Sequence, residues 1–198
     1  MKQILFALLI SIFFMSSIGV CSESAVPVDI DQYKLKPSWH LKKYWYNKDN
    51  SKKLTDLSLS LTMSDSVGDQ PGIALDELKR VFLDYLHTHF EKAGFRFVDK
   101  NPRGLLVLNI TEMTQGDRTK RIVAGEFGAG AAKLFIDGYL KDIEGGIVVA
   151  AFRARKKDAG DAGLRDVSQD IGPTLVKEMS EKISRNLSKE LRRSMKIR

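Results

Sequence analysis

The stretch RIVAGEFGAGAAKLFIDGYLKD, residues 121–142, decides how the middle of the chain folds. Its glycines and nearby Lys133 suggest a phosphate-binding loop, but such a loop needs a helix after the glycines whose N-terminus faces the anion. The residues after the glycines instead alternate, with Leu134 and Ile136 on one face and Asp137 on the other. A period of two indicates a strand. We therefore interpret the glycines as a bend that leads into a β-ribbon.

The known nucleotide-binding motifs are incomplete in this stretch. The triphosphate-binding loop ends in Gly-Lys-Ser or Gly-Lys-Thr, whereas Lys133 follows alanine and precedes leucine. The dinucleotide motif G-x-G-x-x-G could begin at Gly128 and Gly130, but its third glycine is missing. A small-ligand or nucleotide-binding enzyme that uses the Gly125–Gly130 loop is therefore the alternative hypothesis for function, and not the leading one.

Further strands are predicted on both sides of the glycine stretch, in runs that alternate or are rich in apolar residues. These runs are LTDLSLSLTMS (54–64), FRFVD (95–99), GLLVLNITEM (104–113) and IVVAAFRARKK (147–157). The last run follows the turn residues Gly145 and Gly146, a pattern typical of a β-hairpin. Together with the residues after the glycines, these runs predict about five strands.

Two amphipathic helices are predicted from apolar residues that recur at spacings of three and four. The first ends at Gly94, a residue type common just after a helix, and the second has Pro173 in its first turn. The apolar stripes comprise Leu75, Leu78, Phe82, Leu86, Phe90 and Ala93 in the first helix, and Leu175, Met179, Ile183, Leu187, Leu191 and Met195 in the second. The elements together predict an α+β fold, with a mostly antiparallel sheet and both helices packed on one face.

The first 22 residues have the layout of a secretory signal peptide, in which Lys2 precedes the apolar run ILFALLISIFFM and a group of small residues. The run is too short to span a bilayer comfortably. Cys21, the only cysteine, stands where a lipoprotein signal places its acylated residue, although Val20 departs from the small residue usual before it. Acylation of Cys21 and ordinary cleavage nearby are both retained. The chain is expected to be exported to the periplasm, free or lipid-anchored to the outer membrane.

After the signal, residues 23–53 form a lead-in segment rich in lysine and aromatic residues, and residues 54–198 form a single domain. A chain of this length can bury a sizeable core. Aromatic residues interleaved with lysines suit a membrane interface or nucleic acid. The preferred interpretation is a tether whose aromatic residues partly pack on the domain.

Positive charge is concentrated near the C-terminus. The net charge is +7, and residues 153–198 hold thirteen Lys and Arg against seven Asp and Glu. The basic residues of the last helical turns suit a solvated helix end that complements the helix dipole; the functional hypothesis is a contact surface for another envelope protein or an anionic envelope surface. These residues are Arg185, Lys189, Arg192, Arg193 and Lys196. The exported location excludes nucleic acid, and membrane contact is expected only through a lipid anchor or surface charge.

No cluster of residues predicts catalysis, a metal or a cofactor. His87 and His89 are two positions apart on a helix, so that they point away from each other and cannot share a metal. His40 lies in the lead-in segment. The aspartates and glutamates are scattered over strand ends and turns, with no predicted pair for acid–base chemistry. We therefore expect a protein that is not an enzyme and that binds no cofactor.

The stretch from residue 118 to residue 157 resembles a family of exported bacterial proteins, domain of unknown function 4410. The family pattern is an arginine, then a Gly-Phe-Gly-Ala-Gly core and two strands joined by a tight glycine turn. The matching residues are Arg121, Gly125, Phe127, Gly128, Ala129 and Gly130, with Glu126 inserted before the phenylalanine. The resemblance implies a small envelope protein, often a lipoprotein, and supplies no catalytic residues. The leading hypothesis is an exported, non-catalytic binding or assembly module that acts through surface contacts.

Overall fold

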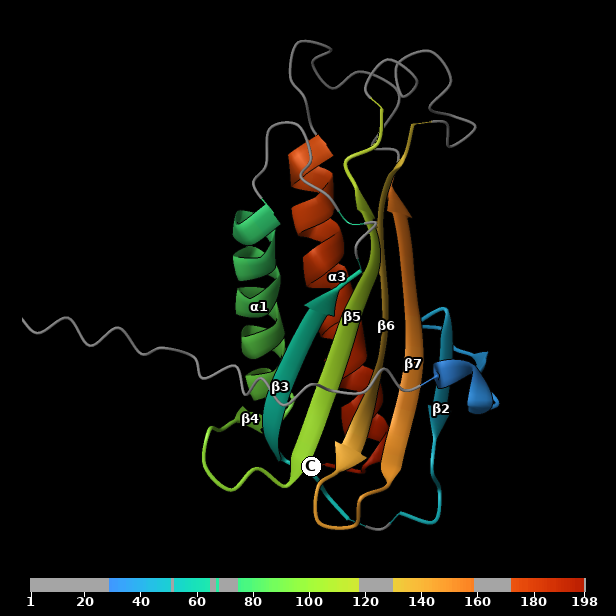
Figure 1. The fold of residues 1–198 in the computed structure, drawn as a ribbon, viewed down its shortest axis with the longest axis vertical. Helices are drawn as coiled ribbons and strands as arrows, with labels where there is room; N and C mark the ends of the chain where they lie inside the picture. Colours follow the sequence, from blue (N-terminus) through green and yellow to red (C-terminus); the bar gives the residue numbers. More distant parts are fainter. Residues whose placement is uncertain are drawn as a thin grey trace, which may run out of the picture.

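The computed structural model describes residues 29–50, 52–64, 67, 75–117, 130–158 and 172–197. Within these residues, one sheet is covered on one face by two helices (Figure 1). In chain order the elements are η1 (Ile30–Gln32), β1 (Lys36–Pro37), β2 (Lys43–Tyr46), β3 (Asp56–Met63), α1 (Leu75–Lys92), β4 (Arg96–Phe97), β5 (Gly104–Thr114), β6 (Ala132–Asp142), β7 (Val148–Asp158) and α3 (Gly172–Ser194). Neither helix has an apolar stretch of the length that crossing a bilayer requires, as judged over the described residues.

The α+β class predicted from the sequence is confirmed, whereas the sheet differs from the prediction in detail. It has seven strands in the order β1-β2-β7-β6-β5-β3-β4 and is mixed, because β3 pairs in parallel with both β4 and β5. The parallel pairs follow from α1, which carries the chain back along the sheet so that the next strand starts at the same end as β3. The two strands beyond the predicted five are β1 and β2. They have two and four residues, which is too few to show an alternation.

The core lies between the sheet and the two helices. All the predicted apolar residues of the second helix are buried, and so are those of the first from Leu78 onward. They share one hydrophobic cluster with the strand residues Leu57, Leu108, Ile136 and Phe152. The two amphipathic stripes therefore meet the same face of the sheet, as predicted.

The β6–β7 hairpin is confirmed. The two strands are antiparallel, and their turn contains Gly146 at φ 65°. At the other end of β6, the residues after the glycines form a strand and not a helix, as predicted. Gly130 has φ 71°, and its carbonyl oxygen accepts a hydrogen bond from the backbone N–H of Asp117 at 3.0 Å. The chain thus returns to the end of β5 at the point where β6 begins.

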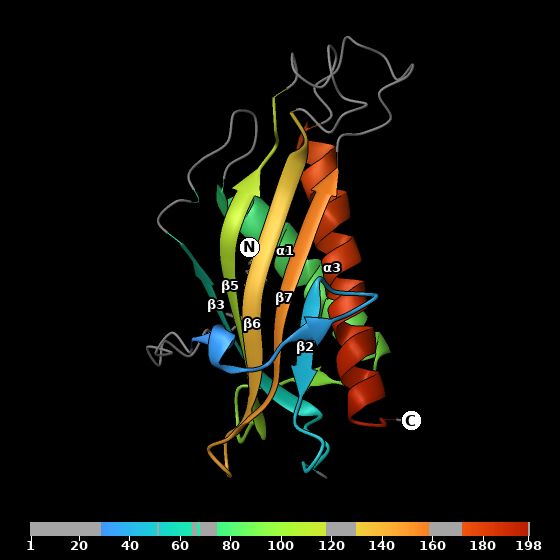
Figure 2. The same ribbon diagram turned by 90° about the vertical axis from the view of Figure 1, so that its right-hand side faces the viewer.

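Part of the lead-in segment is built into the sheet. Tyr44 lies in β2, pairs with Phe152 of β7 and is buried in the core. Trp45 points to the opposite face, where its ring lies 4.8 Å from that of Tyr33. The aromatic residues of this segment therefore pack on the domain in part, as predicted, but they do so by extending the sheet by two strands beyond β7 (Figure 2).

Candidate functional site

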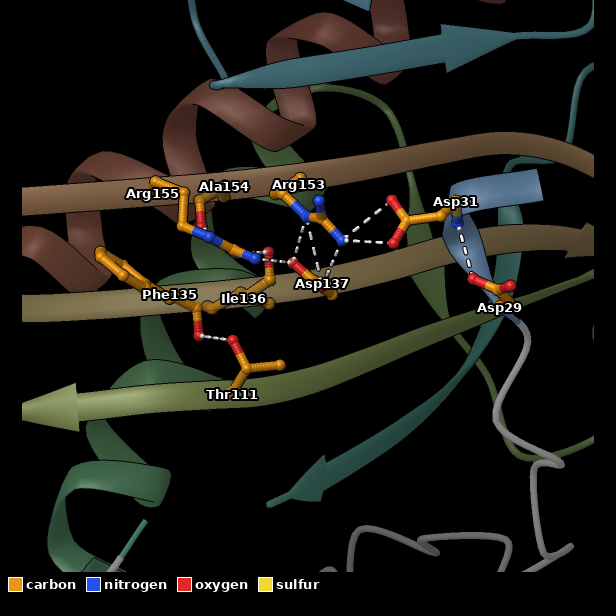
Figure 3. Close-up of polar contacts among 9 residues, drawn as sticks. All are labelled: Asp29, Asp31, Thr111, Phe135, Ile136, Asp137, Arg153, Ala154 and Arg155. Atoms are coloured by element: carbon orange, nitrogen blue, oxygen red, sulfur yellow. Dashed lines mark hydrogen bonds and ion pairs between the residues drawn. The ribbon is translucent and has the colours of Figure 1, made fainter. Parts of the chain in front are cut away.

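The sheet face away from the helices carries a network of charged side chains (Figure 3). Asp137 on β6 and Arg153 on β7 are register partners, and Arg153 Nη2 lies 3.2 Å from Asp137 Oδ2. Arg155 forms an ion pair with the same carboxylate, and its guanidinium lies 5.0 Å from the ring centroid of Phe135. Arg153 also reaches Asp31 of η1 at 3.2 Å. The network therefore fastens the lead-in segment to the sheet.

The charges of this network are balanced internally. Burial alone would lower the pKa of Arg153, but the carboxylates of Asp137 and Asp31 outweigh it and raise that pKa above its ordinary value. The side chains of Arg153 and Asp137 are 23% and 17% exposed. Because each guanidinium already has a carboxylate partner, the network is better suited to holding the fold than to binding a partner.

A second charged cluster lines a small cleft at the β6–β7 turn, with a volume of about 360 Å³. Asp142 is 2% exposed and lies 2.9 Å from Lys52 Nζ. Burial would raise the pKa of Asp142, but Lys52 and the backbone N–H groups of Gly145 and Glu144 lower it overall. The carboxylate is therefore fully engaged in holding the turn, and it offers no free acid for catalysis.

Of the basic residues predicted on the last helical turns, four lie on α3 and Lys196 lies just beyond its end, and the structure separates the five into two kinds. Arg185 lies 3.8 Å from Glu181, and Arg192 donates through Nε to the carbonyl oxygen of Ile197, which caps the helix. Lys189, Arg193 and Lys196 are exposed. Within the described residues these three side chains form no ion pair.

Glu190 lies among these cations in the sequence, but within the described residues it forms no ion pair with them. Its Oε2 atom is buried without a hydrogen-bond partner in the described residues, and its charge acts on Tyr44 of β2. Burial holds the pKa of Tyr44 well above its usual range, and its hydroxyl donates to Ser194 Oγ at 3.0 Å. The cations of α3 are therefore less compensated than the sequence indicates.

The lead-in segment lies directly beside this helix (Figure 2). Asn186 Nδ2 of α3 donates to the carbonyl oxygen of His40, in the loop between β1 and β2, at 2.9 Å. The Tyr44–Ser194 hydrogen bond makes a second connection about two helical turns further along α3. Two stretches that are far apart in the sequence thus form one surface, which we call the lead-in/α3 surface: the exposed residues Lys36, Trp39, Lys42, Lys189, Arg193 and Lys196.

Lys92 of α1 adds to the positive charge near α3, and the sequence pattern did not indicate this contribution. His89 Nε2 lies 3.8 Å from Glu181. Burial lowers the pKa of His89; Glu181 opposes this, and Lys92, Arg185 and Lys189 lower it further. Lys92 of α1 and the two cations of α3 therefore all lie close enough to His89 to act on its imidazole. Helical spacing places His89 and Lys92 on one face of α1, but only the packing of α1 against α3 brings them to Arg185.

Several predicted residues lie outside the part of the chain that the structure describes. They are the candidate acylation residue Cys21 and, of the glycine motif, Arg121, Gly125, Phe127 and Gly128. Gly130 is the described end of that motif, and it leads into β6. A phosphate loop on this motif would therefore lack the following helix whose N-terminus stabilises the anion. The enzyme hypothesis gains no support from this geometry, and a thermal-shift screen with nucleotides would test it.

The described residues contain no cluster of three or more metal-ligating side chains. His87 contacts the ring of Phe97 at 4.5 Å, and His89 faces Glu181 on the neighbouring helix. The two histidines therefore have separate surroundings, as their spacing indicates.

The comparisons with known proteins assign no family. No family model matches the chain, and no curated protein matches it. Among solved structures, the PelC dodecamer from Paraburkholderia phytofirmans has 10% identity and a TM-score of 0.44, covering 73% of this chain and 96% of that chain. The DUF330 protein XCC0632 from Xanthomonas campestris has 12% identity and a TM-score of 0.46, covering 83% and 93%. These likenesses are too low to carry an argument, and the resemblance to family 4410 stays a hypothesis.

Proposed function

We propose that the protein is an exported, non-catalytic binding or assembly module of the bacterial cell envelope, which acts by surface contact. The observation that carries this proposal is the joining of the lead-in segment to α3. The hydrogen bond between Asn186 and His40 connects residues that are 146 positions apart and merges two basic stretches into one surface. A contact module needs such a surface, and it needs no catalytic cluster.

The charge of the lead-in/α3 surface supports an acidic partner. Between Asp31 and Asp49 the chain contains five lysines and no acid. Lys189 and Arg193 on α3 and Lys196 just beyond it are exposed, and within the described residues Glu190 forms no ion pair with them. A surface of one sign attracts the opposite charge and speeds the encounter with it. The partner class is therefore an acidic face of another envelope protein or an anionic envelope surface.

Export is the part of the proposal that rests on residues 1–22. The signal-peptide layout places the folded domain in the periplasm, either free or held at the outer membrane through Cys21. Incorporation of labelled palmitate, compared between the wild type and Cys21→Ser, separates these two forms. Cell fractionation tests export itself. A chain found in the cytoplasm would contradict the proposal.

A charge-reversal experiment tests the surface. In the test variant, Lys189, Arg193 and Lys196 are changed to glutamate, and Arg192 is kept because it caps the helix. In the matched control, three exposed cations on other elements, Arg80, Lys100 and Arg103, are changed to glutamate. Both variants change the net charge equally, so that a difference between them reports the position of the charge.

The measurement is the recovery of partners from a bacterial envelope extract, with membrane association followed in parallel. We expect the α3 variant to lose its partners or its membrane association, and the control to keep them. Equal recovery with both variants would show that the surface makes no specific contact. Thermal melting of each purified variant checks that the fold is intact.

A further inference from the structure

Trp39 is the most exposed large apolar side chain in the described part of the chain. Its side chain and backbone together are 97% exposed, against 44% for Ile143 and 46% for Ile147, the other large hydrophobic residues classed as exposed. Indole is a large aromatic group that proteins usually bury against other side chains. Its full exposure at one position calls for a physical reason.

The loop that carries Trp39 is held firmly in place. Ser38 Oγ accepts hydrogen bonds from the backbone N–H groups of His40 and Leu41, at 3.3 and 3.2 Å. Leu41 is 4% exposed and belongs to the core, and the carbonyl oxygen of His40 accepts the hydrogen bond from Asn186. The backbone on both sides of Trp39 is thus fixed, and the indole projects from an ordered loop. Binding through such a loop loses little conformational entropy.

The surroundings of Trp39 are cationic. Lys36 and Lys42 precede and follow it in the loop region, and Lys43 is the register partner of Pro37. All three lysines are exposed, and within the described residues none forms an ion pair. On α3, Lys189 lies one helical turn from Asn186, which contacts the same loop. The exposed indole therefore stands on a segment that also presents exposed lysines without ion-pair partners among the described residues.

We propose that this loop is a membrane-contact site for anionic phospholipid, in which Trp39 enters the bilayer interface and the lysines lie over the headgroups. Tryptophan is enriched at the depth where headgroups meet acyl chains. Lysines near an anionic leaflet add electrostatic attraction, and the combination of an apolar and a basic signal gives firmer binding than either one alone. The proposal rests on the proposed function and names its surface partner.

Fluorescence of Trp39 gives a direct test. The exported form is used in a Cys21→Ser background, so that no acyl chain contributes, and Trp45→Phe leaves Trp39 as the single tryptophan. The protein is mixed with vesicles of equal parts phosphatidylcholine and phosphatidylglycerol, or with vesicles of phosphatidylcholine alone. We expect a blue shift of Trp39 emission, and quenching by brominated acyl chains, only with the anionic vesicles.

Vesicle sedimentation measures the contribution of each group. We expect Trp39→Ala to weaken binding to the anionic vesicles about tenfold, with a similar loss for the double change Lys42→Ala and Lys43→Ala. Ile147→Ala and Lys100→Ala, at exposed positions on other turns, are the matched controls and should bind as the wild type does. Circular dichroism should be the same for all variants, because these side chains are exposed.

Three results would overturn the proposal. The first is unchanged Trp39 emission with anionic vesicles, and the second is an equal shift with neutral vesicles. The third is loss of a captured acidic protein in Trp39→Ala while vesicle binding is absent, which would assign the site to a protein partner. The proposed function fails separately, if fractionation finds the chain in the cytoplasm, whatever the vesicles show.

Discussion

Gly138 of β6 lies directly opposite Phe152 of β7, and the phenyl ring occupies the space that a side chain at residue 138 would fill. A Cβ atom added at Gly138 would lie 2.6 Å from Phe152 Cζ and 2.5 Å from the carbonyl oxygen of Val107. Phe152 itself is completely buried. At the centre of the sheet, the ring of Phe152 therefore packs over Gly138, which has no side chain.

This contact predicts the effect of Gly138→Ala. The added methyl group cannot be accommodated without moving Phe152 or the β5 backbone, and such overpacking destabilises by about 1–3 kcal/mol or more. Gly146→Ala is the control, because its Cβ would meet nothing within 4 Å and only its φ of 65° is unfavourable. Urea unfolding should show the larger loss for residue 138. A smaller loss there than at residue 146 would contradict the packing described.

The Asp137 network predicts that loss of its carboxylate costs more unfolding free energy than loss of the more exposed Glu112–Lys133 ion pair. In Asp137→Asn, two half-buried guanidinium groups lose a carboxylate partner and Arg153 keeps only Asp31, which we expect to cost about 1–3 kcal/mol of unfolding free energy. In Glu112→Gln, the pair with Lys133 is lost where both side chains are more exposed, with an expected cost below about 1 kcal/mol. Limited proteolysis should cut the lead-in faster in Asp137→Asn. Equal cutting in both variants would argue against the fastening role of Arg153.

Asp142 should make stability fall in acid. Its pKa in the folded protein is lower than the ordinary 3.8, so the unfolded chain takes up the proton first as the pH falls. The stability that Asp142 contributes is thus present above 3.8 and is lost as the pH falls through the folded-state pKa. We expect Asp142→Asn to be less stable than the wild type at neutral pH, with a gap that narrows in acid. Asp84 is exposed on α1, so Asp84→Asn is the control: its unfolding is measured at neutral and at acid pH in the same way.

His89 should make the free energy of unfolding depend on pH in a second range, closer to neutral pH than that of Asp142. Burial lowers its pKa from the ordinary 6.5, so below 6.5 the unfolded chain binds the proton more readily than the folded one. Stability therefore falls as the pH drops from 6.5 toward the folded-state pKa. His89→Gln should flatten this part of the stability curve, and Glu181→Gln should steepen it, because Glu181 opposes the shift. An unchanged slope in His89→Gln would contradict this assignment.

The long elements could be predicted from the sequence because their patterns are complete. Each apolar stripe repeats over several helical turns, and the residues after Gly130 alternate over eleven positions of β6. The parallel pairing of β3 with β5 could not be predicted, because alternation shows which face is buried and not which strand is the neighbour. The strands β1 and β2, with two and four residues, are too short for a pattern, whereas β4 lies within the run predicted at residues 95–99.

The candidate surface was predictable only in parts. The basic residues of α3 and the lysine-rich lead-in are visible in the sequence, but their union depends on the contact of Asn186 with His40 across 146 positions. The hydrogen bond of Arg192 to Ile197 and the burial of Glu190 Oε2 follow from side-chain directions that spacing does not fix. For the same reason, the exposure of Trp39 among buried aromatic neighbours could not be foreseen.

The hydrogen bond from Tyr44 to Ser194 spans 150 positions, and it gives the protein a particular order of maturation. Tyr44 lies in β2 and Ser194 at the end of α3, so the contact that covers this part of the core forms only after α3 has been synthesised. Pairings that join distant segments form slowly. The closing of the core over Tyr44 is therefore expected to be a late step of folding.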